Sequence, residues 1–224
     1  MPAAACTRDV FVGSHSKVWK GLAPRLGVRP TLAIGHRDIA GYAFSPHDRV
    51  WVLSYSRLPA ENAALLHALR DACVGEVVYV SSSSVIVGSR TACYEYPRVK
   101  RQAELDALAL PNARVLTIGL MYEAPEELPG GPVVAASYEE LAAFVAAPGW
   151  PDEGGRRKHL FRVVHRPFGH AVERQAHAAY GQLLQWSGRY PCLLRPVDLV
   201  LRACGVRWYG YVHLSNGLWI STTS

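Results

Sequence analysis

The sequence has no run of about twenty apolar residues, which is the length that a helix needs to cross a lipid bilayer. The stretch from Met1 to Asp9 also lacks the basic flank and the long apolar segment of a secretory signal peptide. Half of the 224 residues are hydrophobic, which is enough for the buried core of one domain, or of one domain with a small appendage. We therefore expect a soluble, cytoplasmic protein with no membrane partner.

Cysteine is scarce and scattered along the chain. The five cysteines form no Cys-x-x-Cys pair, and their odd number argues against a disulfide framework and against a structural zinc site. Isolated thiols of this kind are usually buried and behave as small hydrophobic groups. We expect no bound metal and reduced, mostly buried thiols at Cys6, Cys73, Cys93, Cys192 and Cys204.

Acidic residues are scarce in only one part of the chain. Residues 151–210 hold ten Arg and Lys against four Asp and Glu, whereas residues 1–150 hold fourteen of each. The net charge of +6 therefore comes from the last third, where an anionic ligand and an ordinary solvated basic surface are both open interpretations. Because these basic residues are not interleaved with a series of aromatic residues, we do not expect nucleic acid as a partner.

Short apolar runs alternate with helical patterns over the first 120 residues, which predicts an α/β fold with a doubly wound parallel sheet. The expected strands are 10–13, 31–35, 49–54, 76–80 and 113–119. The expected helices are 60–73, 97–108 and 137–146, the last with Ser137 as its N-cap. We expect this core to span residues 1–147. A smaller lobe, 148–224, is expected to be partly integrated with it and to contain a loop at 148–157, a strand at 160–164, a helix at 171–186 and a short terminal strand.

Hydroxyl groups follow the predicted strand 76–80, at the edge of a parallel sheet where ligands bind. Tyr96 and Lys100 come soon afterwards and, one helical turn apart, share a helix face. An ammonium group there stabilises a phenolate and lowers the pKa of the tyrosine. Such a tyrosine can exchange a proton with a substrate hydroxyl or carbonyl, while a nearby serine hydroxyl orients the same oxygen.

These residues resemble the short-chain dehydrogenase/reductase family, and within it the extended branch of nucleotide-sugar epimerases, dehydratases and reductases. The segments that carry the resemblance are Val78 to Gly88, then Tyr96-x-x-x-Lys100, then Gln102-Ala103-Glu104. The resemblance implies a Rossmann-like fold and makes Ser83 the catalytic serine, with Ser82 and Ser84 as close rivals. It further implies that Tyr96 is the general acid/base, and that Lys100 lowers its pKa and binds the cofactor ribose.

The family's cofactor is NAD or NADP, and the resemblance assigns it to the turn after the first strand, where three glycines normally allow the pyrophosphate to approach. This chain retains only the first of them, and its expected phosphate-binding turn is Gly13, Ser14, His15, Ser16 and Lys17. Ser16 and Trp19 stand where the later two glycines are expected, and Gly21 is the nearest replacement for the last.

Two further positions are assigned to the cofactor. Arg37, after the second strand, suits the 2′-phosphate of NADP and slightly favours it over NAD. Ser54, after the third strand, is expected beside the adenine side of the cofactor.

The resemblance implies an NAD(P)-dependent oxidoreductase or epimerase that acts on a nucleotide sugar or a similar hydroxy/keto substrate, an anionic small molecule. It also suggests a homodimer packed through the helices that carry Tyr96. The altered glycine turn supports a different hypothesis, a non-catalytic relative that has lost the dinucleotide and serves as a binding or partner subunit. Five basic residues are expected to meet a substrate diphosphate, namely Arg156, Arg157, Lys158, Arg162 and Arg166.

Overall fold

The computed structural model of the protein describes residues 8–27, 31–54, 56–72, 74–147, 150, 155–187, 193–206, 208 and 210–223. The chain forms two compact units, each built from separate stretches of the sequence. The first unit comprises Met1–Ser81, Gln102–Thr117 and Ser137–Leu160, and the second comprises Ser82–Arg101, Ile118–Ala136 and Phe161–Ser224. This division differs from the expected boundary at residue 147, which stays a prediction.

The first unit is built on a six-stranded sheet of order β2-β1-β3-β4-β5-β8. Its strands are β1 (Arg8–Val12), β2 (Thr31–Ile34), β3 (Asp48–Val52), β4 (Glu76–Ser82), β5 (Ala113–Ile118) and β8 (Arg157–Leu160). β1 pairs in parallel with both β2 and β3, and β3 pairs in parallel with β4. The predicted α/β, Rossmann-like parallel sheet is therefore confirmed.

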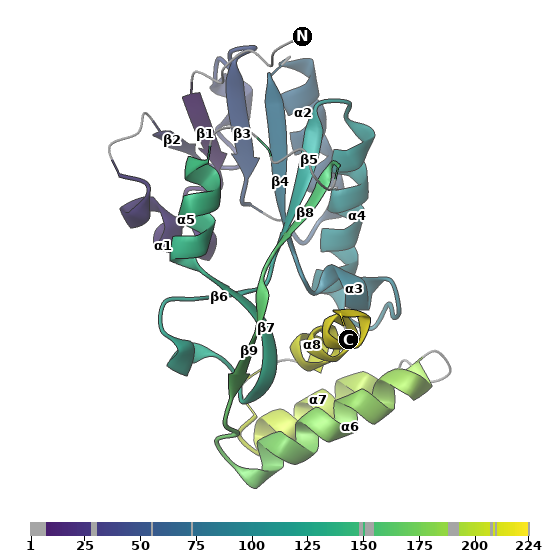
Figure 1. Cartoon of the computed structure of the whole chain (residues 1–224). Helices are drawn as coiled ribbons and strands as arrows, with labels where there is room; N and C mark the ends of the chain where they lie inside the picture. The colour runs from purple at the N-terminus through teal and green to yellow at the C-terminus, as the bar shows by residue number, and fades with distance from the viewer. Residues whose placement is uncertain are drawn as a thin grey trace. The chain divides into compact units, whose positions relative to one another are not determined.

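Helices cover both faces of this sheet (Figure 1). On one face, α2 (Pro59–Asp71) and α4 (Glu95–Ala109) pack on a buried cluster that includes Val10 and Val50. On the other face, which carries α1 (Lys17–Leu22) and α5 (Tyr138–Ala146), Trp51 packs edge-on against Phe144. Neighbouring residues of a strand thus serve opposite layers, as the alternation of side chains along a strand requires.

The strand order creates a switch point at β1. The chain leaves β1 for β2 on one side and returns to β3 on the other, and in open α/β sheets ligands bind outside the carboxyl ends of the strands at such a point. Within the described residues, the connection from β2 to β3 contains only the short 3₁₀ turn η2 (Ile39–Gly41). The ends of β1, β2 and β3 are therefore the positions in this unit where a ligand is expected.

The predicted strands and helices of the first 147 residues agree with the structure to within two residues at either end. The best-defined boundary is the start of α5, where Ser137 and Glu140 form a capping box. The Ser137 hydroxyl accepts from the Glu140 N–H at 3.1 Å, and the Glu140 carboxylate accepts from the Ser137 N–H at 2.7 Å. Both signals lie within one turn of sequence, so the local pattern is sufficient to predict them.

The second unit contains a three-stranded sheet and helices from the end of the chain. The sheet has the order β6-β7-β9, with β6 (Leu120–Tyr122), β7 (Gly131–Ser137) and β9 (Arg162–Arg166), and β7 and β9 are antiparallel. The helices are α3 (Val85–Gly88), α6 (Ala171–Ser187), α7 (Leu194–Ala203) and α8 (Gly210–Thr223). Figure 1 shows α6 and α7 side by side. Tyr180, Leu194 and Leu214 join three of these helices in one buried cluster.

Two predictions for the last third are wrong. The single strand expected at 160–164 is two strands, β8 and β9, which are separated at Phe161 because β8 belongs to the six-stranded sheet and β9 to the three-stranded sheet. The terminal strand expected around Ser215 to Ser221 is the helix α8. This helix packs its Leu214 in the buried cluster with α6 and α7, and its buried Asn216 accepts a hydrogen bond from the Val134 N–H at 3.0 Å, contacts that a local pattern does not reveal.

The cysteines were expected to be reduced and mostly buried, and the described ones agree with this only in part. Cys93 and Cys204 are free, but Cys204 is exposed rather than buried, because it caps the end of α7 at the surface. Cys6, Cys73 and Cys192 lie outside the described residues, as does most of the expected loop 148–157.

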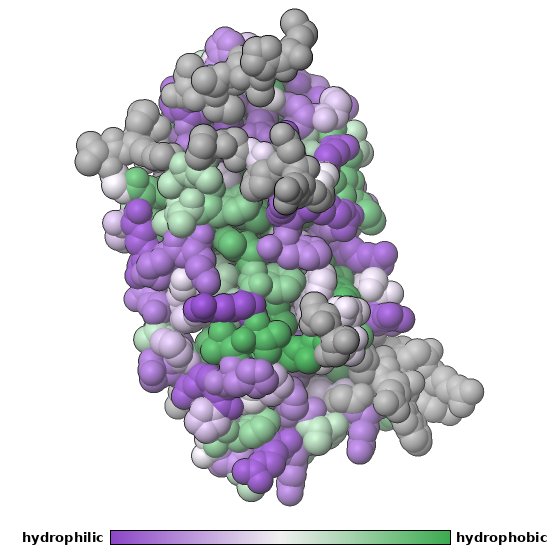
Figure 2. Space-filling model, in the orientation of Figure 1, coloured by the Kyte–Doolittle hydropathy of each residue, from purple (hydrophilic) through white to green (hydrophobic). Residues whose placement is uncertain are grey.

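The surface carries both hydrophilic and hydrophobic side chains. The face shown in Figure 2 combines hydrophilic residues with patches of hydrophobic ones. The exposed large hydrophobic residues include Leu199 and Val200 of α7. No helix in the described part of the chain has the length and apolar character that a membrane crossing requires.

Candidate functional site

Ser83 lies in the turn directly after β4 and is only 7% exposed. Its N–H donates to the Ile118 carbonyl at 2.8 Å, and its carbonyl accepts from the Trp219 indole N–H at 2.8 Å. The hydroxyls of Ser82 and Ser84 are hydrogen-bonded to each other at 3.0 Å. Of the three neighbouring serines, Ser83 is thus held through its backbone from two sides, while its rivals pair with each other.

Tyr96 and Lys100 both lie in the first half of α4, one turn apart. Lys100 is 5% exposed and Tyr96 is half-buried. The Tyr96 ring stacks on Tyr211 of α8, with a centroid distance of 5.6 Å and an interplanar angle of 30°. The orientation of Tyr96 is therefore supported by a residue near the end of the chain, which sequence reasoning missed because it expected no helix there.

A close backbone contact brings the segment after Ser83 against the start of α4. A Cβ atom added to Gly88 would lie 2.6 Å from the carbonyl oxygen of Pro97. The Arg101 guanidinium also donates to the Gly88 carbonyl, at 3.4 Å. The structure thus gathers Ser83, Tyr96 and Lys100 in one compact unit, and only glycine fits at the contact that joins their segments.

Gly13 ends β1 with a φ of 113°, in the region that favours glycine. A Cβ atom there would lie 2.8 Å from the Ser54 backbone nitrogen. The N–H groups of Gly13 and Ser14 both donate to the Ile34 carbonyl, at 2.9 and 3.2 Å. Two of the residues assigned to the cofactor, Gly13 and Ser54, are therefore in direct contact at the switch point of the sheet.

The remainder of the expected phosphate-binding turn departs from a glycine turn. The Ser16 hydroxyl caps α1 by accepting from the Trp19 N–H at 3.0 Å, and α1 has only six residues. Trp19 packs on Phe11 of β1, with ring centroids 4.9 Å apart. The structure places His15 and Lys17 at the surface. A tryptophan therefore fills the place where a third glycine would let the helix approach the sheet.

Gly21 does not take over that role. Its Cα lies against the Tyr138 ring of α5, where an added Cβ atom would come within 2.4 Å of the ring. The close approach is therefore between two helices and not between a helix and the sheet.

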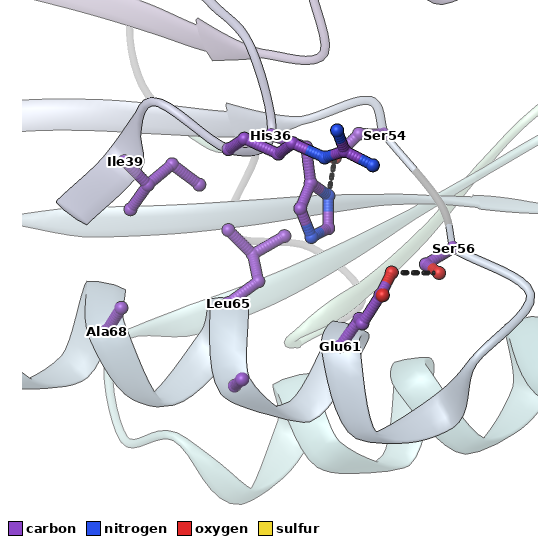
Figure 3. Close-up of a pocket in the computed structure, with 9 residues that line it drawn as sticks. His36, Ile39, Ser54, Ser56, Glu61, Leu65 and Ala68 are labelled. Carbon is purple, nitrogen blue, oxygen red and sulfur yellow. Dashed lines mark hydrogen bonds between the residues drawn. The ribbon is translucent and has the colours of Figure 1, made fainter.

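A cavity of about 500 Å³ opens beside the ends of β2 and β3 (Figure 3). His36 and Ser54 meet in it through a hydrogen bond of 2.9 Å between the His36 Nδ1 and the Ser54 hydroxyl. Sequence reasoning identified Arg37 and Ser54 but missed the residues that α2 contributes. The full lining is His36, Arg37, Ile39, Ser54, Ser56, Glu61, Ala64, Leu65 and Ala68.

Four of the basic residues expected to meet a diphosphate make contacts within the protein. They are Arg156, Arg157, Arg162 and Arg166. Their respective partners are the carbonyl oxygens of Leu110 and Ala113, the Glu104 carboxylate at 2.6 Å, the Tyr122 hydroxyl at 3.1 Å, and the carbonyl oxygens of Pro125 and Leu128. These contacts contribute to the stability of the fold, and a role of the five basic residues toward a substrate diphosphate stays a prediction.

No family model matches the sequence, and no curated protein matches it. Solved structures do match. A short-chain dehydrogenase/reductase superfamily protein from Agrobacterium tumefaciens with bound NAD aligns with a TM-score of 0.53 at 14% identity, covering 76% of this chain and 82% of its own. The chain has the short-chain dehydrogenase/reductase fold.

Two further structures share this fold. MoeE5 in complex with UDP-glucuronic acid and NAD aligns with a TM-score of 0.51 at 15% identity, over 70% of this chain and 78% of its own. The dTDP-4-dehydrorhamnose reductase from Yersinia enterocolitica aligns with a TM-score of 0.50 at 13% identity, over 81% and 82%. At these identities the likeness concerns the fold, and it confirms the short-chain dehydrogenase/reductase resemblance at that level.

Proposed function

We propose that the chain is an NAD(P)-dependent oxidoreductase or epimerase that acts on a nucleotide sugar or a similar hydroxy/keto substrate. The observation that supports this most is the joining of the Ser83 turn to the first turn of α4 at Gly88 and Pro97. That contact holds a hydroxyl, a phenol and an ammonium group in one unit. Structures with the same fold contain NAD and UDP-glucuronic acid, which are the cofactor and substrate classes proposed here.

In this proposal Tyr96 exchanges a proton with the reacting oxygen of the substrate. Lys100, one turn further along α4 and almost fully buried, stabilises the phenolate strongly because little water screens its charge. Lys100 also binds the cofactor ribose, and the Ser83 hydroxyl orients the substrate oxygen. The nicotinamide, when bound, supplies the hydride chemistry.

The adenosine end of the cofactor fits the chain better than the pyrophosphate does. The cavity beside the ends of β2 and β3 is lined by Arg37 and Ser54, whereas the space beside Gly13 is filled by the Ser54 backbone. Arg37 suits a 2′-phosphate, so we favour NADP over NAD. Ser14, His15, Ser16 and Lys17 complete the proposed phosphate turn, although the Ser16 hydroxyl already serves as a helix cap.

The second candidate function is that of a non-catalytic relative which has lost the dinucleotide and acts as a binding or partner subunit. The specific observation in its favour is the packing of Trp19 on Phe11, which replaces the glycine contact of a dinucleotide-binding turn. Under either function, a homodimer and a small anionic ligand remain predictions.

Titration with NADPH and NADH, followed by nicotinamide fluorescence, separates the two candidates. We expect both to bind at sub-millimolar concentration, NADPH more tightly. If neither binds, the oxidoreductase proposal fails and the second candidate is favoured.

A further inference from the structure

Asp198 is a buried carboxylate that the proposed mechanism does not use. It lies in the middle of α7 and is 9% exposed. Taking a carboxylate out of water is costly unless its oxygens accept hydrogen bonds. One of its oxygens, Oδ1, accepts from the Tyr180 hydroxyl of α6 and, at 2.7 Å, from the N–H of Gly210, the first residue of α8. A single carboxylate oxygen therefore joins three helices of the second unit.

The start of α8 is fixed by this contact. The N–H groups of a first helical turn have no partner within the helix, and a negative charge is favourable beside them. A Cβ atom added to Gly210 would lie 2.5 Å from the hydroxyl oxygen of Tyr94, so only glycine fits there. Burial, followed by the charge of Asp198, raises the pKa of Tyr94, and this phenol stays protonated. The first residue of α8 thus has a defined place beside α6, α7 and the residue that precedes α4.

Tyr211, the next residue of α8, carries this placement to the proposed catalytic tyrosine. Its ring meets Tyr94 edge-on, with centroids 5.5 Å apart and an interplanar angle of 71°. The same ring stacks on Tyr96 at 5.6 Å and 30°. Because aromatic pairs prefer particular geometries, the orientation of Tyr96 depends on where Tyr211 lies. The position of Tyr211 depends in turn on Gly210.

We propose that Asp198 is a positioning residue for Tyr96: by holding the Gly210 N–H, it keeps the Tyr211 ring in the place where it orients the Tyr96 phenol. Asp198 acts through α8 and is not itself a catalytic residue. The competing interpretation is that Asp198 only stabilises the packing of the three helices, which predicts a loss of stability with no change at Tyr96. The inference rests on the proposed function, because the orientation of Tyr96 affects turnover only if Tyr96 transfers a proton.

The first test compares two substitutions of Asp198. Asp198→Ala removes the acceptor, whereas Asp198→Asn retains a side-chain oxygen that can accept from both donors. In Asp198→Ala kcat should fall roughly 10- to 100-fold, because a small displacement of a reacting group is costly, while KM stays within about twofold. Asp198→Asn should restore kcat to within about threefold of the wild-type value. The measurement is nicotinamide absorbance with a panel of UDP- and dTDP-sugars.

A double variant tests the route through Tyr211. Tyr211→Leu removes the ring that stacks on Tyr96 and should lower kcat to an extent similar to Asp198→Ala. If both changes act on the same contact, the double variant should lie within about threefold of the single variants. Losses that multiply in the double variant would overturn the route through Tyr211.

A second readout does not depend on activity. In the full chain labelled with ¹³C-tyrosine, the ring signals of Tyr96 can be assigned by their loss in Tyr96→Phe. These signals respond to a ring stacked on Tyr96. We expect Asp198→Ala to shift them in the same direction as Tyr211→Leu, and Asp198→Asn to leave them unchanged.

Glu173→Ala is the matched control. Glu173 is another carboxylate of the second unit that accepts from backbone N–H groups, those of Gly130 and Gly169, at 3.0 and 2.9 Å. Its loss should lower the free energy of unfolding in urea and leave both kcat and the Tyr96 signals unchanged. Circular dichroism shows whether each variant is folded. Asp198→Ser, which retains a shorter hydroxyl group, replaces Asp198→Ala if that variant does not fold, with the same expected changes.

The outcomes separate this inference from the proposed function. Unchanged kcat and unchanged Tyr96 signals in folded Asp198→Ala overturn the role of Asp198, while turnover by the wild-type protein leaves the proposed function standing. If the wild-type protein neither binds a nicotinamide cofactor nor turns over a nucleotide sugar, the proposed function fails. In that case the Tyr96 signals still decide whether Asp198 orients this residue: a shift in Asp198→Ala supports it, and no shift overturns it.

Discussion

The segment that carries Ser83, Tyr96 and Lys100 differs from the turn that carries Gly13, Ser16 and Trp19 in how tightly its backbone is specified. The first segment is joined by a glycine contact at Gly88 and supported by α8. The second segment retains one glycine contact, at Gly13, and elsewhere uses a helix cap and aromatic packing. The residues proposed for catalysis thus lie in a segment whose backbone is fixed by close contacts. In the proposed cofactor turn, a helix cap and aromatic packing stand where glycine contacts were expected.

The largest expected effect is on catalysis, in the segment that carries Ser83, Tyr96 and Lys100. Tyr96→Phe should lower kcat by roughly 10²- to 10⁴-fold, because it removes the proton that the phenol transfers and leaves the ring in place. The measurement is the change in nicotinamide absorbance with a panel of nucleotide sugars. Tyr211→Phe is the control, since it retains the ring stack with Tyr96 and should leave kcat nearly unchanged. Full activity in Tyr96→Phe would remove this residue from the mechanism.

The next effect concerns a buried histidine in the same unit. His213 is 3% exposed, and within the described residues neither of its ring nitrogens has a hydrogen-bond partner. It stacks on Tyr180 at 5.5 Å, and its other neighbours are His177 and Glu173. Burial, with a smaller contribution from the charge of His177, lowers the pKa of His213 from 6.5 to about 4, against the opposing effect of Glu173.

The sign of the pH dependence follows from this lowered pKa. Between pH 6.5 and 4 the unfolded chain binds a proton that the folded chain does not, so the free energy of unfolding falls as the pH falls. The loss should be on the order of 3 kcal/mol over this window. Urea unfolding of His213→Phe should show a flatter pH profile, whereas the exposed His165→Gln should follow the wild-type profile. An unchanged profile in His213→Phe would contradict the assignment.

Two glycine substitutions measure how much each segment depends on its close backbone contact. Gly88→Ala and Gly13→Ala each place a Cβ atom under 3 Å from backbone atoms, of Pro97 and of Ser54 respectively. Each should lower the free energy of unfolding by about 1–3 kcal/mol. Gly217→Ala in α8, where nothing lies within 4 Å, should instead be neutral or stabilising by up to about 1 kcal/mol. Equal, small effects at all three positions would remove the structural distinction.

The smallest expected effect concerns cofactor binding by Arg37. Arg37→Ala should weaken NADPH binding by roughly tenfold, as loss of one charge-assisted contact predicts, and should leave NADH binding within about twofold. Arg57→Ala is the control, because Arg57 is exposed and not among the cavity lining. A parallel loss of both cofactors in Arg37→Ala would show that the residue supports the cavity wall and not the 2′-phosphate.

Sequence patterns were sufficient where the determining residues are close together. The capping box of α5 and the apolar faces of α2 and α4 were predictable because propensity, capping and periodicity act over a few residues. The terminal strand was wrongly predicted, because a local pattern does not show the distant residues that α8 contacts, such as Val134, whose N–H donates to Asn216. Glu61 gave no sequence signal of a site, since an acid in the first turn of a helix is also an ordinary stabilising residue.

By itself, then, the sequence determined the parallel α/β sheet and the helix that aligns Tyr96 with Lys100, because hydrophobic periodicity and helix geometry are local. Tertiary structure alone decided that Gly88 meets Pro97, that Tyr211 supports Tyr96, and that Glu61 enters a cavity with Ser54. It also decided that Trp19 occupies the space beside Phe11. Each of these contacts joins distant stretches of the chain, and their free energy depends on packing that appears only once the chain is folded.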